Sequence, residues 1–222
     1  MADVEELLGF APPDFFFQEE QDLQFIAEEG QQLLSSKYLL APLAEVMGQE
    51  SYVKALMGWN YKGLAFQFEV TLENPLSVAF PEIQQGDAIE LFIDTRALTS
   101  ARTTHRFCHH FYFLPERFEG HEKGEITRFR TEDSHPLCSE EGLELQVTKR
   151  PKGYVAKMTI PRECLVGYDP QEGSRIGFTY RVRRTGGPTV PFGLANEHCR
   201  IEYLPYLWPT LRLVSTGKEK NK

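Results

Sequence analysis

The 222-residue sequence has no long hydrophobic run and no basic leader. No apolar stretch approaches the ~18 residues that a membrane-spanning helix needs, so we expect no membrane partner. The first residues, MADVEELLGF, are acidic, whereas a secretory signal begins basic and then turns apolar. These absences predict a cytoplasmic protein, although export by a route that does not use such a signal stays open.

Cysteines are few and scattered. The four are Cys108, Cys138, Cys164 and Cys199, and they form no CxxC pair and no tight cluster. In a chain of this size, such spacing predicts reduced, partly buried thiols rather than a disulfide framework.

An excess of positive charge is also missing. The formal charge is −8, and residues 1–50 contain eleven acidic side chains against one basic side chain, Lys37. The remaining residues carry 32 − 11 = 21 acidic and 24 − 1 = 23 basic side chains, so the body is close to neutral. Nucleic-acid binding requires a basic surface, and we therefore expect no nucleic-acid partner.

Familiar catalytic motifs are absent. The sequence has no G-x-S-x-G elbow, P-loop, dinucleotide fingerprint or HExxH. Cys108 and His109 do not form a dyad, because neighbouring residues of a strand point to opposite faces. Glu90 and Asp94 fit outward polar positions on a strand better than a glycosidase pair. We therefore expect a protein without catalysis and without a cofactor.

Short segments of alternating polarity are abundant. Residues 86–115, GDAIELFIDTRALTSARTTHRFCHHFYFLP, read as a strand, a loop and a second strand. Ile89, Leu91 and Ile93 share one face of the first strand, as expected for a sheet packed on a core. In the second strand, which we expect to begin at His105, neither face is plainly polar. Both faces are therefore expected to be covered, or one of them lines a pocket.

The same reasoning predicts further strands along the chain. They are expected at residues 37–43, 51–56, 59–70, 77–80, 143–147, 154–160, 175–183, 199–203 and 210–214, with a possible edge strand inside the polar excursion 116–140. Short strands in this number, with turns every ~8–12 residues and few short helices, indicate an all-β fold. We expect an antiparallel β-sandwich of jelly-roll type.

Three regions are expected along the chain. Residues 1–34 form an acidic extension packed on the body, residues 35–215 the sandwich, and residues 216–222 a disordered tail. Phe15, Phe16 and Phe17 are too apolar for a solvated segment, so they dock either on the body or on another chain.

Four blocks resemble the family-9 carbohydrate-binding modules and the wider DOMON-like sandwiches. They are GWNYKGLAFQFEV (58–70), GDAIELFIDTR (86–96), GYVAKMTIPRECLVGYDPQEGSRIGFTYRV (153–182) and YLWPTLRLV (206–214). The resemblance implies a non-catalytic module that binds a sugar. Such modules typically hold their ligand between exposed aromatic rings, whereas Trp59 and Trp208 occupy structural positions here. The segment THRFCHHFYFLP resembles a feature of an uncharacterised subgroup.

Arginines, histidines and an aspartate on the central strands form the candidate ligand site. Arginine forks match carboxylates and phosphates and also bond vicinal hydroxyls, so the expected ligand is a glycan or a small polyhydroxylated or anionic molecule. The candidate residues are Asp94, Arg96, His105, Arg106, His109, His110, Arg181 and Arg183. The alternative is a solvated charged face with a turn contact between Asp94 and Arg96.

No metal site is predicted from these residues. His105 and His109 share a strand face but lie ~13 Å apart, and Cys108 and His110, ~6.6 Å apart, need ligands from elsewhere. Two other functions stay open: a protein–protein interaction module that uses the N-terminal segment or a sheet edge, and, more remotely, a metal or haem binder. A ligand module predicts that Arg96, Arg106, His109 and His110 converge on a concave surface, whereas an interaction module predicts that they are dispersed, with a large apolar patch elsewhere.

Overall fold

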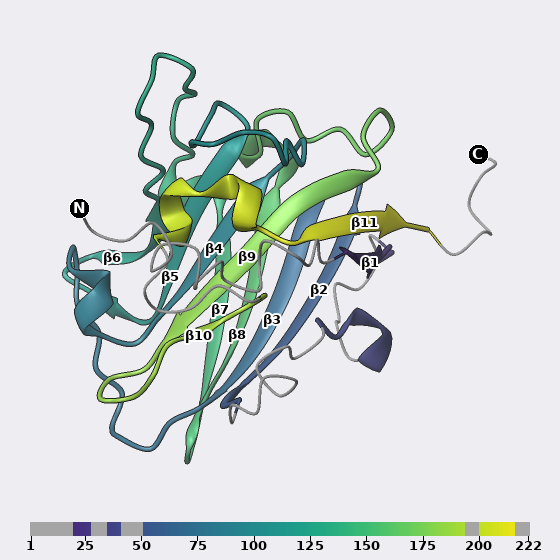
Figure 1. Ribbon diagram of the computed structural model, residues 1–222. Helices are drawn as coiled ribbons and strands as arrows, with labels where there is room; N and C mark the ends of the chain where they lie inside the picture. The colour runs from purple at the N-terminus through teal and green to yellow at the C-terminus, as the bar shows by residue number, and fades with distance from the viewer. Residues whose placement is uncertain (1–19, 28–34, 41–50, 194–199, 216–222) are drawn as a thin grey trace, which may run out of the picture.

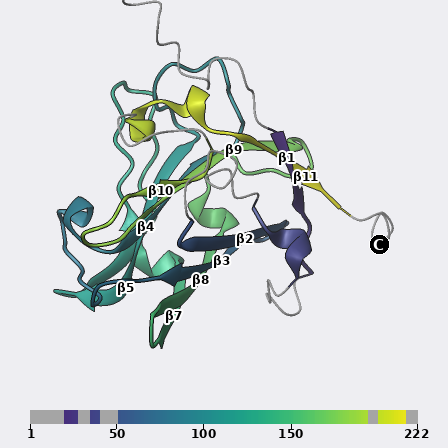
Figure 2. The ribbon, with the colours of Figure 1, turned by 60° about the horizontal axis from the view of Figure 1, so that its bottom comes forward.

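Two β-sheets face each other in the computed structural model, which describes residues 20–27, 35–40, 51–193 and 200–215 (Figures 1 and 2). The larger sheet has the order β1-β11-β9-β4-β5-β6, and β10 also pairs with β9. Its strands are β1 (Glu20–Gln24), β11 (Thr210–Val214), β9 (Arg175–Arg183), β4 (Ala88–Asp94), β5 (Cys108–Phe118), β6 (His121–Glu125) and β10 (Val190–Pro191).

The smaller sheet has the order β2-β3-β8-β7. Its strands are β2 (Val53–Asn60), β3 (Gly63–Thr71), β8 (Gly153–Pro161) and β7 (Glu144–Arg150). The helical turns of the described residues are all short 3-10 helices: η2 (Ser36–Tyr38), η3 (Ile83–Gln85), η4 (Glu140–Gly142), η5 (Arg162–Cys164), η6 (Ile201–Tyr203) and η7 (Pro205–Leu207). The predicted all-β sandwich with few short helices is thus confirmed, and every strand pairing is antiparallel except that of β1 with β11.

The main hydrophobic core lies between the sheets and follows the alternation of the sequence. Ile89, Leu91 and Ile93 of β4 are buried there beside Phe66 and Phe68 of β3. Phe178 of β9 also stacks on Phe66 across the interface, with 5.8 Å between ring centroids. Burial of these side chains is the principal force that holds the layers together.

The outer face of the larger sheet is also covered in part. Phe92 and Cys108 pack under Ile201 and Trp208, because the segment with η6 and η7 crosses over this sheet (Figure 1, yellow). Near the other end of the strands, Tyr112 and Leu114 pack with Ile83 of η3. This double covering explains why neither face of β5 is plainly polar in the sequence.

Both tryptophans have the structural role that the sequence predicted. Trp59 is buried and its indole nitrogen Nε1 donates to the carbonyl oxygen of Leu23, 2.9 Å away. Trp208 is buried as well, and its Nε1 donates to the carbonyl oxygen of Ile201 at 2.8 Å. Neither ring is therefore available as an exposed sugar platform.

Several predicted strands differ in the structure. Residues 36–38 form η2 and residues 201–203 form η6, so the predicted strand at 199–203 is wrong where the structure describes it, and that at 37–43 is reduced to an antiparallel bridge of Leu39 with Leu56. Residues 77–80 form no strand, so that prediction is wrong as well; the backbone of Ser77 bonds the carboxylate and the amide of Asp87 instead. The edge strand of the excursion is β6 at His121–Glu125.

The described part of the predicted N-terminal extension belongs to the larger sheet, where β1 pairs with β11. Residues 1–19, 28–34 and 216–222, with the Phe15–Phe17 run and the predicted tail, lie outside the described residues. In the part of the chain that the structure describes, no helix is long and apolar enough to span a membrane.

Candidate functional site

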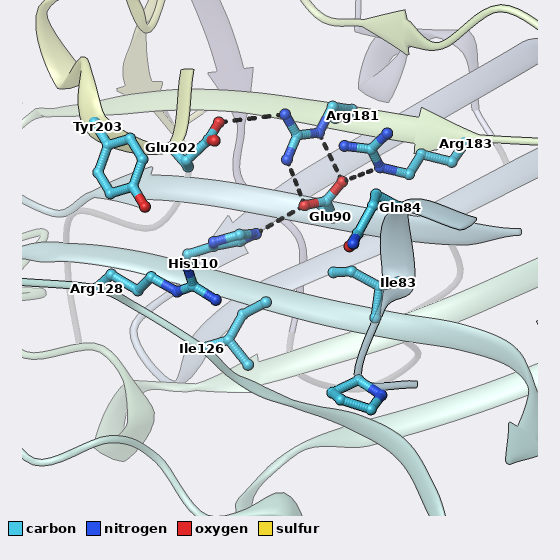
Figure 3. Close-up of a pocket in the computed structure, with 11 residues that line it drawn as sticks. Ile83, Gln84, Glu90, His110, Ile126, Arg128, Arg181, Arg183, Glu202 and Tyr203 are labelled. Atoms are coloured by element: carbon cyan, nitrogen blue, oxygen red, sulfur yellow. Dashed lines mark hydrogen bonds and ion pairs between the residues drawn. The ribbon is translucent and has the colours of Figure 1, made fainter. Parts of the chain in front are cut away.

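A pocket of about 320 Å³ opens on the outer face of the larger sheet, between the segment that carries η6 and the segment that carries η3 (Figure 3). Its volume lies at the lower end of the range of small-molecule sites. The residues that line it are Pro81, Ile83, Gln84, Glu90, His110, Ile126, Arg128, Arg181, Arg183, Glu202 and Tyr203.

Glu90 forms the floor of this pocket and is 1% exposed. The register of β4 and β9 sets Glu90 opposite Arg181. Arg181 holds the carboxylate with two nitrogens, because Nε lies 2.6 Å from Oε2 and Nη2 lies 2.6 Å from Oε1. Arg183, two residues along the same face, adds a hydrogen bond from Nε to Oε2 at 2.7 Å. The buried charge of Glu90 is therefore paired by two arginines.

His110 completes the floor from the neighbouring strand β5. Its Nε2 lies 3.0 Å from Glu90 Oε1, and its ring stacks on Phe92, with 4.2 Å between centroids. Glu202 of η6 approaches from above, and its Oε2 accepts a hydrogen bond from Arg181 Nη1 at 3.3 Å. The side chains of three strands and of one covering turn are thus fixed against one another.

The electrostatics of the pocket follow from these contacts. Burial raises the pKa of the Glu90 carboxyl, but hydrogen bonds from Arg181 and His110 lower it by more, so the pKa lies well below its usual range. The lining contains three arginines and two glutamates, a net charge of +1 with His110 neutral. Within the described residues, no carboxylate pairs with Arg128 or with the terminal nitrogens of Arg183. These donors remain free for an incoming ligand.

The pocket includes three of the eight predicted site residues, His110, Arg181 and Arg183, and the other five lie outside it: Asp94, Arg96, His105, Arg106 and His109. Arg96 faces Glu172 at 4.0 Å and its side chain is partly exposed. Arg106 pairs with Asp133 on the surface and its side chain is 59% exposed. Because His109 points to the inner face of β5, the four residues Arg96, Arg106, His109 and His110 do not converge on one concave surface.

A buried cluster of Asp94, His105 and Cys108 lies at one end of β4 and β5. The expectation of a strand beginning at His105 is wrong: a turn precedes β5, and its Cys108 amide bonds the carbonyl oxygen of His105. His105 Nε2 thereby comes within 3.3 Å of Cys108 Sγ and 3.5 Å of Asp94 Oδ2. Asp94 also accepts hydrogen bonds from the backbone of Arg96 and Leu98, so the predicted Asp94–Arg96 turn contact is present.

A second buried cluster contains His109, Glu125 and His135. Glu125 Oε1 lies 2.9 Å from His109 Nδ1 and 2.9 Å from His135 Nε2. Burial raises the pKa of Glu125, but the hydrogen bonds with His109 and His135 lower it by more, to about 2. Sequence spacing missed this cluster, because Glu125 and His135 belong to the polar excursion that we read as surface.

The cysteine prediction is wrong for two of the four residues. Cys138 and Cys164, 26 residues apart, form a disulfide with a Cα–Cα distance of 5.1 Å. Their separation in sequence gave no sign of this contact, which arises where η5 meets the excursion. Cys108 is a free, buried thiol, as expected, and Cys199 lies outside the described residues.

Several residues of the pocket were not predicted. Arg128 follows β6 in the polar excursion, and Glu202 and Tyr203 belong to η6, which the sequence predicted as a strand, so neither segment indicated a contact with Glu90. Glu90 was assigned to an outward polar position, which is correct for its face but not for its burial. Its acidic side chain within an apolar strand was the one available signal, and its partner could be found only from the pairing of β4 with β9.

No protein-family model and no curated protein sequence matches the chain. Solved structures do resemble it. A family-9 carbohydrate-binding module from Caldicellulosiruptor kristjanssonii in complex with cellotriose has a TM-score of 0.65 and 15% identity, over 92% of this chain and 98% of that chain. A family-9 module from the same organism in complex with glucose has a TM-score of 0.64 and 15% identity, over 92% of this chain and 99% of that chain.

A candidate carbohydrate-binding protein from Bacteroides uniformis has a TM-score of 0.55 and 8% identity, over 88% of this chain and 99% of that chain. These likenesses extend over nearly the whole of each compared chain, whereas the identities are too low to carry side-chain roles from one protein to another. The chain therefore has the β-sandwich fold of family-9-like carbohydrate-binding modules.

Proposed function

We propose that this protein is a non-catalytic binding module that holds a glycan, or another small polyhydroxylated ligand, in the pocket above Glu90. The solved structures of the same fold supply the ligand class, since two of them are described as complexes with cellotriose and with glucose. The observation that carries the proposal for this chain is the pocket itself, with its fixed floor of charged side chains.

The floor suits recognition because its geometry is set before any ligand arrives. Glu90, Arg181 and His110 already satisfy one another, so a ligand does not have to order them, and the entropic cost of binding falls. The pocket rim adds the phenol ring of Tyr203 and the amide of Gln84, groups that contact sugar faces and hydroxyls.

The charge of Arg128, which no carboxylate of the described residues balances, and the unused N–H donors of Arg183, which pairs with Glu90 through Nε, favour a ligand that carries a carboxylate. Arg128 and the terminal nitrogens of Arg183 face the pocket without a carboxylate partner among the described residues (Figure 3). A guanidinium matches a carboxylate with two parallel hydrogen bonds, which are stronger than bonds to a neutral hydroxyl. The favoured ligand is accordingly an acidic sugar unit such as a uronate.

Calorimetric titration with cellotriose and with a trisaccharide that contains glucuronic acid tests the proposal. We expect the acidic trisaccharide to bind more tightly, and Arg128→Ala to weaken its binding roughly tenfold or more through loss of a charge-assisted contact. Arg106→Ala is the matched control, because it removes an exposed arginine that pairs with Asp133 outside the pocket. The proposal is contradicted if neither sugar binds to the folded protein. It is also contradicted if Arg128→Ala and Arg106→Ala lose the same amount of affinity.

The dispersal of Arg96, Arg106, His109 and His110 favours a second function, an interaction module for another protein. Its proposed contact is the segment with Phe15–Phe17, which lies outside the described residues. Replacing these three phenylalanines by serine, followed by pull-down with the intact and the substituted chain, tests it. A partner captured equally well by both chains rules out this contact.

A further inference from the structure

We infer that His109, Glu125 and His135 form a binding site for one divalent transition-metal ion of the zinc class, separate from the pocket above Glu90. The three residues come from β5, β6 and the loop that follows β6, and all three are buried. An ion here joins those three segments and has a structural role.

The distances suit a metal ion. One ligand atom of each residue lies within 4.8 Å of the other two, and Glu125 Oε1 is 2.9 Å from a nitrogen of each histidine. In a tetrahedral zinc site with bonds of ~2.0–2.1 Å, ligand atoms are about 3.3 Å apart. The two glutamate–histidine distances of 2.9 Å therefore have to grow by only about 0.4 Å to make room for the ion. Two imidazoles and a carboxylate form a ligand set that zinc favours.

Neighbouring backbone groups hold two of the three ligands, His135 and Glu125, in the required orientation. His135 Nδ1 lies 2.7 Å from the carbonyl oxygen of Arg106, which directs the other ring nitrogen, Nε2, towards Glu125. The backbone amide of Cys138 donates to Glu125 Oε2 at 2.7 Å and leaves Oε1 for the ion. A backbone carbonyl behind a histidine and a donor behind a carboxylate are the usual supports of metal ligands.

Hydrogen bonding alone satisfies this cluster poorly. Both nitrogens of His135 face oxygen acceptors, and a neutral imidazole carries one N–H, so one contact lacks a proton unless the buried ring is charged. A metal ion between Nε2 and Glu125 removes this conflict without a buried imidazolium. Oε1 is also crowded, since it accepts a third hydrogen bond from the Thr127 hydroxyl at 2.6 Å.

The cluster of Asp94, His105 and Cys108 is the competing candidate and fits less well. The amide of Phe107 donates to His105 Nδ1 at 3.3 Å, so the ring proton lies on Nε2, the nitrogen that faces Cys108 and Asp94. That proton is donated to Cys108 Sγ, and Asp94 accepts hydrogen bonds from the backbone of Arg96 and Leu98, so hydrogen bonding satisfies this cluster without an ion.

Zinc titration of the chelator-stripped, full-length protein against a chromophoric competitor tests the inference, with metal content measured after gel filtration. We expect one zinc ion per chain, and a loss of at least tenfold in affinity for Glu125→Gln. His121→Asn and Cys108→Ser are controls that should leave affinity unchanged, because His121 pairs with Glu140 at the surface and Cys108 belongs to the competing cluster. A folded wild-type protein that binds no zinc overturns the inference, as does a Cys108→Ser variant that loses it.

Glu125→Gln removes a buried acceptor and can impair folding, so a measurement on the wild-type protein is needed as well. X-ray absorption of the zinc-loaded protein should show only nitrogen and oxygen neighbours, including imidazole. A sulfur neighbour overturns the inference in favour of Cys108. Neither result depends on whether the protein binds a sugar.

Discussion

Among single residues, Glu90 is the one on which the pocket depends. It is almost fully buried and receives hydrogen bonds from Arg181, Arg183 and His110. Removing one partner of a buried charge network leaves the others unpaired, which costs more than the network itself contributes. Glu90 therefore links the stability of the fold to the shape of the candidate site.

The depressed pKa of Glu90 makes part of the folding free energy dependent on pH. The pKa of its carboxyl is below the unfolded value of 4.5, so the native state binds fewer protons, and the stabilisation is present above about pH 4.5 and lost as pH falls. Between pH 6 and pH 3 the loss amounts to about 2 kcal/mol. Glu90→Gln should lower the free energy of unfolding by roughly 3 kcal/mol at pH 7 and flatten this dependence.

Urea unfolding at several pH values measures both effects. Glu73→Gln is the matched control, since the Glu73 side chain is 73% exposed and pairs with Arg184 at the surface. If Glu90→Gln retained the acid sensitivity of the wild-type protein, Glu90 would not be its source.

The sequence predicted part of the residue-level picture. Alternation along one strand put Arg181 and Arg183 on the same face, because strand periodicity fixes which face a side chain occupies, and the folded structure brings them beside His110. It could not bring His135 to His109 or Cys138 to Cys164, because those contacts depend on the path of an irregular loop. Short-range patterns carry no information about such a path.

Among the elements, the pairing of β3 with β8 depends on a glycine at each end. Gly63 has φ +145° and Gly153 has φ +138°, values at which side chains are strained. A Cβ at Gly63 would collide with the carbonyl oxygen of Ile160, and one at Gly153 with that of Val70. Glycine at these two positions therefore lets the backbones of β3 and β8 lie in close contact.

Gly153→Ala should consequently destabilise the protein by roughly 3 kcal/mol or more, through backbone strain and displacement of a paired strand. Gly120→Ala is the control. Gly120 also has a positive φ, +93°, but no atom lies within 4 Å of its added Cβ, so we expect a loss of only about 1 kcal/mol. Thermal unfolding of both variants measures the difference. Equal losses would show that backbone conformation, and not close approach, is responsible.

Element prediction succeeded where alternation was long and failed where it was short. The strands at β3, β4, β8 and β9 were predicted because their apolar residues repeat every second position over seven or more residues. The segment at η6 has the same apolar character over three residues, but it packs on the outer face of a finished sheet. Apolar character alone does not distinguish a strand from a covering turn.

At the scale of the whole molecule, tyrosines buried in the sandwich link its stability to alkaline pH. Burial raises the pKa of Tyr52 and of Tyr112 to about 12, and it raises the pKa values of Tyr154, Tyr168 and Tyr180 above the ordinary value as well. A phenol whose folded pKa exceeds its unfolded value of 10 stabilises the native state below pH 10 and loses that contribution as pH rises.

We therefore expect the fold to unfold cooperatively above pH 10, with ionisation of these buried phenols coinciding with the loss of structure. Absorbance at 295 nm and circular dichroism, recorded on the same samples, measure the two events. Full ionisation of all nine tyrosines in a protein that keeps its native circular dichroism would contradict the prediction.

The fold as a whole was predicted more completely than its site. Alternating strands, turns and a neutral body indicate a sandwich. Structures only 15% identical to this chain share that fold, because many sequences satisfy the same pattern of buried and exposed positions. The pocket depends on the register of three strands and on where η6 crosses them, which only the folded arrangement provides.

The parallel pairing of β1 with β11 gives the molecule a mechanical property. The two strands run in the same direction over five residue pairs, from Glu20 beside Thr210 to Gln24 beside Val214. A force that pulls Glu20 and Val214 apart acts along the two strands in opposite senses, so it shears all of their hydrogen bonds together instead of unzipping them one at a time. A module tethered through both strands would therefore resist tension as a clamp. Trp59 of the smaller sheet connects this strand pair to that sheet, because its Nε1 donates to the carbonyl oxygens of Leu23 in β1 and Val214 in β11.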